Sequence, residues 1–237
     1  MLAVADGIST CDVGSGRLAS WLTIQTLARA FGPDADAAGF GAAVADAARR
    51  SAASLLEWAL EKGYEQQLRD GADLMGTTLT VAWLEGRELR LANLGDSRAY
   101  LIDEHDVEQL TVDGDLGSSL LGQGYPPETL IEISGMAAPP EISAAVSSTT
   151  PASSHSRRPV PAAFYSLPLL PGDILVLCTD GLVEEGMFLE PETLGHLVRT
   201  HRDRPAQQIA ELLADSADTL QRLRLPWNPM ASAIISR

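Results

Sequence analysis

The sequence has only two cysteines, Cys11 and Cys178, among its 237 residues. Two thiols are too few for a disulfide framework, and Cys178 lies inside an apolar run, so a reducing compartment is expected, with the cytoplasm as the default. No apolar run approaches the roughly 20 residues that a membrane-spanning helix needs, and Met1 is not followed by the pattern of a signal peptide. These absences predict a protein without membrane association or export.

Positive charge is also scarce, because 17 basic residues stand against 32 acidic ones and give a net charge of −15. A chain of this balance repels phosphate backbones and anionic lipid surfaces, so neither nucleic acid nor membrane is an expected partner. The hydrophobic content of 45% is enough to bury one core in a chain of this length. We therefore expect residues 1–237 to form a single domain, and the protein to be a monomer.

Hydrophobic periodicity predicts the order of the secondary-structure elements. Helical spacing begins at Leu18 and ends near Gly32, and a second helix is expected over 41–62. Residues 77–102 read as three short strands of one antiparallel meander, with tight turns at Glu85-Gly86 and Gly95-Asp96. The later elements expected are a short strand at 107–110, order again from Phe164, a buried strand at 174–179, helices near 191–201 and 205–223, and a last strand in SAIIS.

Residues 137–163 are rich in Pro, Ser, Thr and Ala and contain few large apolar side chains. Such a stretch buries too little to order itself, so we expect a flexible surface loop. The remaining elements do not alternate as parallel βαβ units do, since two helices come early, two come late, and strands lie in the middle and at both extremes. This order favours antiparallel sheets covered by helices.

An aspartate followed by glycine ends an apolar stretch at two distant places, Asp6-Gly7 in LAVADGIST and Asp180-Gly181 in DILVLCTDGLVEE. A single Asp-Gly dipeptide is most often a turn. Two strands that both end in this way can, however, place two carboxylates side by side, and Mg²⁺ and Mn²⁺ prefer oxygen ligands. The repetition therefore predicts a cation site shared by Asp6 and Asp180.

Four segments stand in a fixed order: VADG, MGTTLTVAWL, LANLGDSRAYL and LVLCTDGLVEE, with two predicted helices between the first and the second. Together they resemble the metal-dependent serine/threonine protein phosphatases of type 2C, the PPM family, from Ala3 to about Ile235. The resemblance implies an α+β fold, a four-layer α-β-β-α sandwich in which a helical pair covers each of two antiparallel sheets. It also implies a phosphoprotein substrate, such as the product of a serine/threonine kinase.

The same resemblance implies two Mn²⁺ or Mg²⁺ ions between the sheets and a water, held by these ions, that attacks the phosphorus of a phosphoserine or phosphothreonine. On this basis Asp6 bridges the ions, the Gly7 carbonyl supports one of them, and Asp180 supplies much of the metal site on the side opposite Asp6. Asp113 in QLTVDGD matches an aspartate of a further, looser metal site, although Gly114 follows it where many members have histidine.

The GDSR segment contains two residues that we interpret as structural. Asp96 is similar to a family aspartate that organises a turn by hydrogen bonding, and Arg98 follows it on the strand. A turn aspartate that accepts from nearby backbone amides explains this pattern fully. We therefore do not expect either side chain to be catalytic.

The sequence also departs from the family pattern. Members usually carry an upstream strand with an arginine for the phosphate and an acidic metal ligand, and this chain starts too late to have it, so a truncated reading frame is one expectation. Near the other end, PWNPMASAII stands where an Asp-Asn or Asp-Asp pair is usual, and Asn228 is the nearest polar candidate. Because less negative charge remains, one bound ion is more secure than two.

The loop after Asp6, ISTCDVGSGR, lacks the histidine that many relatives have there, so we expect water to protonate the leaving group. Arg17, in the first turn of the following helix, is a candidate for attracting phosphate, although an arginine there more often faces solvent. Three hypotheses stay open: an active phosphomonoesterase that acts on phosphoproteins, a catalytically impaired phosphatase-fold protein that binds a phosphoprotein or regulatory partner, and a truncated form of the enzyme.

Overall fold

The structure is a computed structural model that describes residues 1–31, 39–113, 163–183, 188–224 and 233–236. Its strands form two four-stranded sheets in which every pairing is antiparallel. The first sheet has the order β1-β2-β3-β6, made of β1 (Leu2–Val4), β2 (Leu79–Glu85), β3 (Glu88–Leu94) and β6 (Ala163–Pro168). The second has the order β5-β4-β7-β8, made of β5 (Val107–Gln109), β4 (Arg98–Ile102), β7 (Ile174–Cys178) and β8 (Ala233–Ser236).

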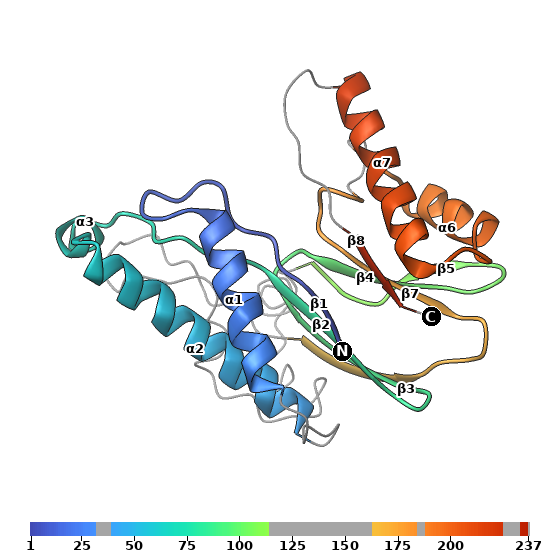
Figure 1. Cartoon of the computed structure of the whole chain (residues 1–237), viewed down its shortest axis with the longest axis horizontal. Helices are drawn as coiled ribbons and strands as arrows, with labels where there is room; N and C mark the ends of the chain where they lie inside the picture. The colour runs from blue at the N-terminus through green and yellow to red at the C-terminus, as the bar shows by residue number, and fades with distance from the viewer. Residues whose placement is uncertain (32–38, 114–162, 184–187, 225–232, 237) are drawn as a thin grey trace, which may run out of the picture.

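Helices cover the outer face of each sheet. Helices α1 and α2 lie on the side of the first sheet, and α6 and α7 lie on the side of the second (Figure 1). Their bounds are α1 (Gly16–Ala30), α2 (Phe40–Glu61), a short α3 (Glu65–Arg69), α6 (Pro191–Thr200) and α7 (Ala206–Arg224). The predicted four-layer α-β-β-α sandwich is therefore confirmed.

Strand β7 shows how the sequence builds these layers. Successive side chains of a strand point to opposite faces, so Leu175 and Leu177 pack between the two sheets, while Ile174, Val176 and Cys178 pack against α6 and α7. A strand that is covered on both faces has an apolar residue at every position. The continuous run over residues 174–178 in the sequence is the direct result.

The first two helices form a pair that packs on β2 and β3. Leu27 of α1 and Val44 of α2 join the cluster that includes Leu79 and Val81 of β2. Ser15 caps α1, since its hydroxyl accepts from the Leu18 N–H at 3.3 Å. The helices expected near 18–32 and over 41–62 are confirmed within a few residues at each end.

The expectation that residues 77–102 form one meander is wrong at its last strand. Strands β2 and β3 pair as a hairpin, but β4 belongs to the second sheet, where it pairs with β5 and β7. The chain leaves the first sheet at Gly95, and this position needs glycine for two reasons. Its φ is +104°, and an added Cβ atom would lie within 3 Å of the Thr78 side chain. The Gly95-Asp96 pair is thus a crossing between sheets and not a hairpin turn.

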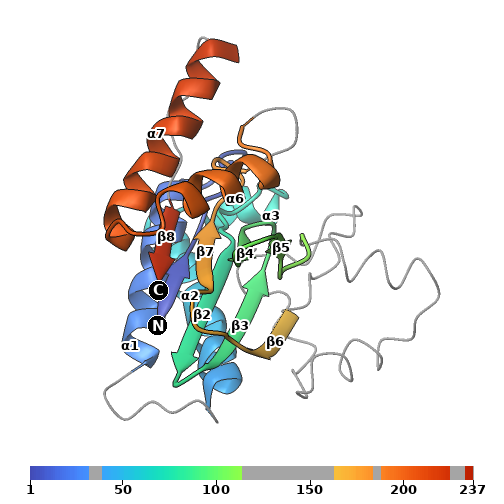
Figure 2. The ribbon, with the colours of Figure 1, turned by 90° about the vertical axis from the view of Figure 1, so that its right-hand side faces the viewer.

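The first strand of one sheet and the last strand of the other lie next to each other. Figure 2 shows β1 and β8 side by side, and β1 also contacts β7. The expected strands at 107–110 and near the end of the chain are present as β5 and β8, whereas the short α3 was not expected. The predicted loop at 137–163 lies outside the described residues, except for Ala163, with which β6 begins. In the described part of the chain, no helix combines the length and the apolar character needed to cross a bilayer.

Candidate functional site

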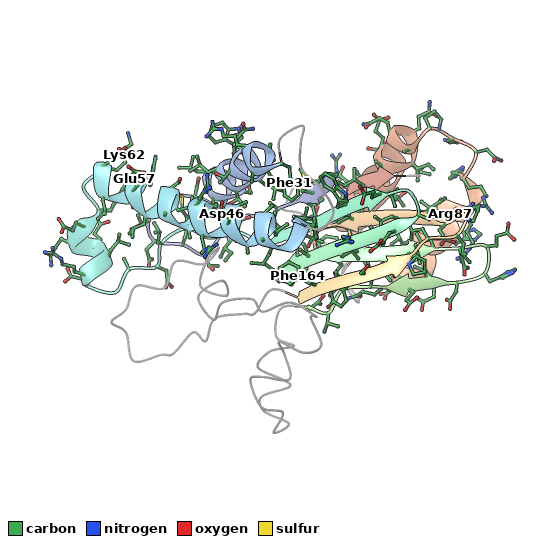
Figure 3. The ribbon with its side chains drawn as sticks, turned by 90° about the horizontal axis from the view of Figure 1, so that it is seen from below. Phe31, Asp46, Glu57, Lys62, Arg87 and Phe164 are labelled. Carbon is green, nitrogen blue, oxygen red and sulfur yellow. The ribbon has the colours of Figure 1, made fainter. Side chains whose placement is uncertain are left out.

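The two Asp-Gly dipeptides meet at one end of the sandwich. Asp6 follows the end of β1 in the first sheet, and Asp180 follows the end of β7 in the second. Strands β1 and β7 contact each other across the interface, and the carboxyl groups of Asp6 and Asp180 lie close enough to interact by hydrogen bonding and by charge. The turn between β2 and β3 marks the opposite end of the first sheet, and Figure 3 labels Arg87 in this turn.

The surroundings of Asp6 disfavour its negative charge. Burial raises the pKa of Asp6 to about 6, helped by the hydrogen bond with Asp180 and by the charges of Asp180 and Asp96. The pKa of Asp96 is also raised, first because its carboxyl is partly removed from water and then because of the charge of Asp180, although the residue as a whole stands at the exposed rim. A divalent cation would offset this concentration of negative charge.

Only a pair of carboxylates meets closely here. Across the residues that the structure describes, no three Asp, Glu, His or Cys side chains converge tightly enough to hold a metal ion. The ligand set therefore rests on Asp6 and Asp180, with Asp96 acting through its charge. The predicted ligand Asn228 lies outside the described residues.

Two threonines in front of β2 fix the backbone of Asp6. The Asp6 N–H donates to Thr78 Oγ1 at 2.9 Å, and the Asp6 carbonyl accepts from the Thr78 N–H at 2.8 Å and from Thr77 Oγ1 at 2.7 Å. With both of its backbone groups held, Asp6 presents its carboxyl in a defined direction. Thr77 and Thr78 fall at the start of the region predicted as strands, and their role in holding Asp6 was not predicted.

Behind these threonines lies a buried hydroxyl network at the crossing between the sheets. Thr78 Oγ1 and Ser97 Oγ are 2.6 Å apart, and Thr80 Oγ1 donates to Asn93 Oδ1 at 2.5 Å and to the Ser97 carbonyl at 3.1 Å. Asn93 in turn donates to the Gly95 carbonyl at 3.2 Å. The network ties the turn that carries Asp96 to the segment that holds Asp6.

Gly7 is required by the close approach of α1. A Cβ atom added to Gly7 would lie 2.0 Å from the carbonyl carbon of Gly16, and one added to Gly16 would lie 2.4 Å from the Gly7 carbonyl oxygen. No side chain fits in such a space, so both positions need glycine. This contact places the first turn of α1, which includes the exposed Arg17, next to the Asp6-Gly7 dipeptide.

Asp113 and Arg98 form an ion pair on the second sheet. The Arg98 Nε donates to Asp113 Oδ1 at 2.8 Å, and Arg98 Nη2 donates to Asp113 Oδ2. Hydrogen bonding to Asp113 raises the pKa of the Arg98 guanidinium above its already high value. The residue expected at a looser metal site is thus paired with the residue expected to be structural.

None of the histidines is placed beside the carboxylate pair by the described structure. His105 follows β4 at its Ile102 end, whereas Asp180 follows the opposite end of β7, where Cys178 pairs with Arg98. His196 lies in α6 and His201 caps its C-terminus. The prediction that water protonates the leaving group stays open, and His155 lies outside the described residues.

Comparison with known proteins adds a sequence match to this geometry. A family model described as protein phosphatase 2C matches residues 1–217. The chain is 28% identical over 138 residues to a putative protein phosphatase of Mycoplasma genitalium, covering 57% of this chain and 49% of that protein. It is 33% identical over 124 residues to the serine/threonine protein phosphatase PstP of Mycobacterium tuberculosis, covering 52% of this chain and 22% of that protein. The chain therefore matches about half or less of the length of these curated relatives.

Solved structures match the fold along nearly the whole chain. The catalytic domain of serine/threonine protein phosphatase PstP, in complex with two manganese ions, superimposes with a TM-score of 0.62 at 24% identity, covering 99% of this chain and 85% of that one. The serine/threonine phosphatase Stp1 from Staphylococcus aureus gives a TM-score of 0.62 at 21% identity, covering 99% of this chain and 82% of that one. At these identities the likeness establishes a common architecture.

Proposed function

The chain belongs to the protein phosphatase 2C family, and from that premise we propose that it is a metal-dependent phosphatase of phosphoserine and phosphothreonine in proteins. The observation that carries the proposal is the meeting of Asp6 and Asp180, two carboxyl groups that are distant in the sequence and follow strands of different sheets. Two acidic groups that lie close enough to interact, from rigid strands, form a fitting place for a hard cation.

The described residues fit a divalent cation, Mn²⁺ or Mg²⁺. Burial and then the neighbouring Asp180 raise the pKa of Asp6 to about 6, and a bound cation would oppose this shift by favouring the charged form. Asp6 and Asp180 would hold the ion, with the Gly7 carbonyl and Asn228 as further candidate ligands. When bound, such an ion would supply the positive charge that activates water near neutral pH and neutralises phosphoryl oxygens.

The protein's own residues contribute orientation. Thr77 and Thr78 hold both backbone groups of Asp6, and the hydroxyl network behind them fixes the turn of Asp96. Rigid placement of charged groups before the reaction is the main means by which a site of this kind lowers a barrier. Arg17 in the first turn of α1 is the candidate for attracting the phosphate, because α1 begins against Gly7.

The acidic character of the chain bears on the substrate. A net charge of −15 attracts segments with basic residues around the phosphorylated serine or threonine and so raises their association rate. We expect phosphopeptides with flanking arginines to be hydrolysed with a higher kcat/KM than acidic ones, and the difference to shrink as salt is added.

The test is hydrolysis of a phosphothreonine peptide with and without Mn²⁺. The wild-type chain should release phosphate only with the metal, and Asp180→Asn should abolish the release. Asp215→Asn, on the exposed face of α7, is the matched control and should retain full activity. Metal-independent turnover, or full activity in Asp180→Asn, would contradict the proposal.

One observation favours a second function, the binding of a phosphoprotein or regulatory partner without turnover. The described part of the chain brings two carboxylates together and no third ligand of the Asp, Glu, His or Cys type. A chain of this kind would bind a phosphothreonine peptide, measured by fluorescence anisotropy, and release no phosphate at any Mn²⁺ concentration. Phosphate release that depends on Asp6 and Asp180 would rule this function out.

A further inference from the structure

Arg98 engages both oxygens of the Asp113 carboxylate. Its Nε lies 2.8 Å from Asp113 Oδ1 and 3.1 Å from Oδ2, and its Nη2 also donates to Oδ2. Gln109 Nε2 adds a contact with Oδ1 at 3.3 Å. A planar guanidinium that engages both oxygens of a carboxylate is the strongest arrangement available to such a pair.

The guanidinium is anchored from a third side. Arg98 Nη1 donates to the main-chain carbonyl of Val183 at 2.8 Å, and Val183 is fully buried three positions after Asp180. Arg98 itself is only 18% exposed at its side chain, whereas Asp113 is 40% exposed. The arginine is therefore a fixed part of the fold, held between β4, the segment of Asp113 and the segment that follows Asp180.

We propose that the Arg98 guanidinium takes the place of a cation at Asp113, so that Asp113 binds no metal in this chain. The inference rests on the proposed function for the main site and departs from the metal role that the family resemblance gives to Asp113. A metal ion at Asp113 would have to displace the guanidinium, which would leave a mostly buried positive charge without its partner and next to another cation.

The same contacts leave Arg98 little capacity to hold phosphate, because three of the five guanidinium N–H groups already donate within the protein. Nε, Nη1 and Nη2 all donate within the protein, to Asp113 and to Val183. A phosphate that took the bidentate position on this arginine would have to displace Asp113. The charges of Asp113 and Asp180 both act on Asp96, so an unpaired Asp113 would add to the negative charge around Asp96.

The test is Mn²⁺ titration, followed by the electron paramagnetic resonance signal of the free ion, on four chains: wild type, Asp113→Asn, Arg98→Gln and the double variant. Asp113→Asn should keep the wild-type stoichiometry, with an affinity within about twofold. Arg98→Gln should gain an additional weak site, and the double variant should lose it again. Arg222→Gln is the matched control: it unpairs Asp218 on the surface of α7 and should gain no site.

Loss of a Mn²⁺ site, or a more than tenfold weaker affinity, in Asp113→Asn would overturn the inference, and so would an Arg98→Gln chain that folds and gains no site. If Arg98→Gln does not fold, the Asp113→Asn chain decides alone. A wild-type chain that binds no Mn²⁺ contradicts the proposed function instead, and a site gained in Arg98→Gln would still support the replacement of a cation by Arg98.

Discussion

Thr78 holds the backbone of Asp6 through two hydrogen bonds, one accepted by its hydroxyl and one donated by its N–H. The Asp6 N–H donates to Thr78 Oγ1 at 2.9 Å, and the Thr78 N–H donates to the Asp6 carbonyl at 2.8 Å. The second bond continues the pattern of the sheet beyond the last paired residues of β1, while the first depends on a hydroxyl side chain. The position of the Asp6 backbone therefore depends on the side chain of residue 78.

Replacing Thr78 by valine should weaken both the fold and the cation site. The Asp6 N–H loses its acceptor, and Ser97 loses its hydroxyl partner, so the free energy of unfolding should fall by about 1 to 3 kcal/mol. Urea denaturation measures this loss, and calorimetry should show weaker Mn²⁺ binding. Thr219→Val in α7, where the hydroxyl bonds only to the Asp215 carbonyl of its own helix, should cost less than about 0.5 kcal/mol. Equal losses in the two variants would contradict the role given to Thr78.

Adding one methyl group at Gly7 should be far more damaging than its size suggests. The new Cβ atom would lie 2.0 Å from backbone atoms of Gly16, so α1 must move away from the site. We expect Gly7→Ala to lower the free energy of unfolding by more than about 3 kcal/mol, measured from urea denaturation. Gly63→Ala is the control, because nothing lies within 4 Å there and only the φ of +83° is unfavourable, at about 1 kcal/mol. A Gly7→Ala chain as stable as Gly63→Ala would show that α1 does not begin against Gly7.

The two cysteines should differ sharply in reactivity. Burial raises the pKa of the Cys178 thiol to about 12, and its side chain is fully enclosed in β7, whereas Cys11 is partly exposed. A chromogenic disulfide reagent at pH 8 should therefore modify one thiol in the native chain and two in urea. The Cys11→Ser chain should react only when unfolded. Rapid native labelling of Cys178 would place β7 at the surface and would contradict the layered core.

The metal-free chain should carry a pH signature of Asp6. Its pKa is about 6 in the folded state against an ordinary value of 3.8, so the folded state binds the proton more tightly. The stabilising contribution is complete below the ordinary value and is lost as the pH rises through about 6. Because Asp6 is only half-buried, solvent screening limits the effect to about 1 to 2 kcal/mol.

The comparison that isolates this contribution is wild type against Asp6→Asn in a chelator. The stability of Asp6→Asn relative to wild type should rise between pH 4 and pH 7. Over this range the wild type loses stability as Asp6 ionises, whereas the asparagine does not titrate. Thermal unfolding at several pH values measures the difference, and other titrating groups cancel to first order. A difference that stays constant over this range would show that Asp6 titrates normally in the folded chain.

The layers of the fold follow from patterns that the sequence displays openly. Helical spacing marks α1 and α2, and the run over residues 174–178 marks a strand buried on both faces. The assignment of β4 to the second sheet could not be read in the same way. Gly95-Asp96 has the composition of a hairpin turn, and only tertiary contacts of Thr78 and Ser97 decide that the chain crosses between sheets there.

The site was foreseeable in its charged residues and not in what holds them. Repetition of Asp-Gly after apolar strands pointed to Asp6 and Asp180, because carboxylates carry a recognisable chemistry. Thr77 and Thr78 look like ordinary strand residues, although two adjacent threonines just before a strand can hold a neighbouring backbone through their hydroxyls. The ion pair between Arg98 and Asp113 joins two segments, and no local sequence pattern predicts that these segments are in contact.

Whether Asp6 and Asp180 together hold one divalent cation can be measured by isothermal titration of Mn²⁺ into wild type, Asp6→Asn, Asp180→Asn and the control Asp215→Asn. At about 4 Å and an effective dielectric constant of about 20, a pair of unit charges interacts by roughly 4 kcal/mol, so either site variant should bind Mn²⁺ more than about 100-fold more weakly. Asp215→Asn should match the wild type. Wild-type affinity in both Asp6→Asn and Asp180→Asn would show that the cation is not held by these two carboxylates.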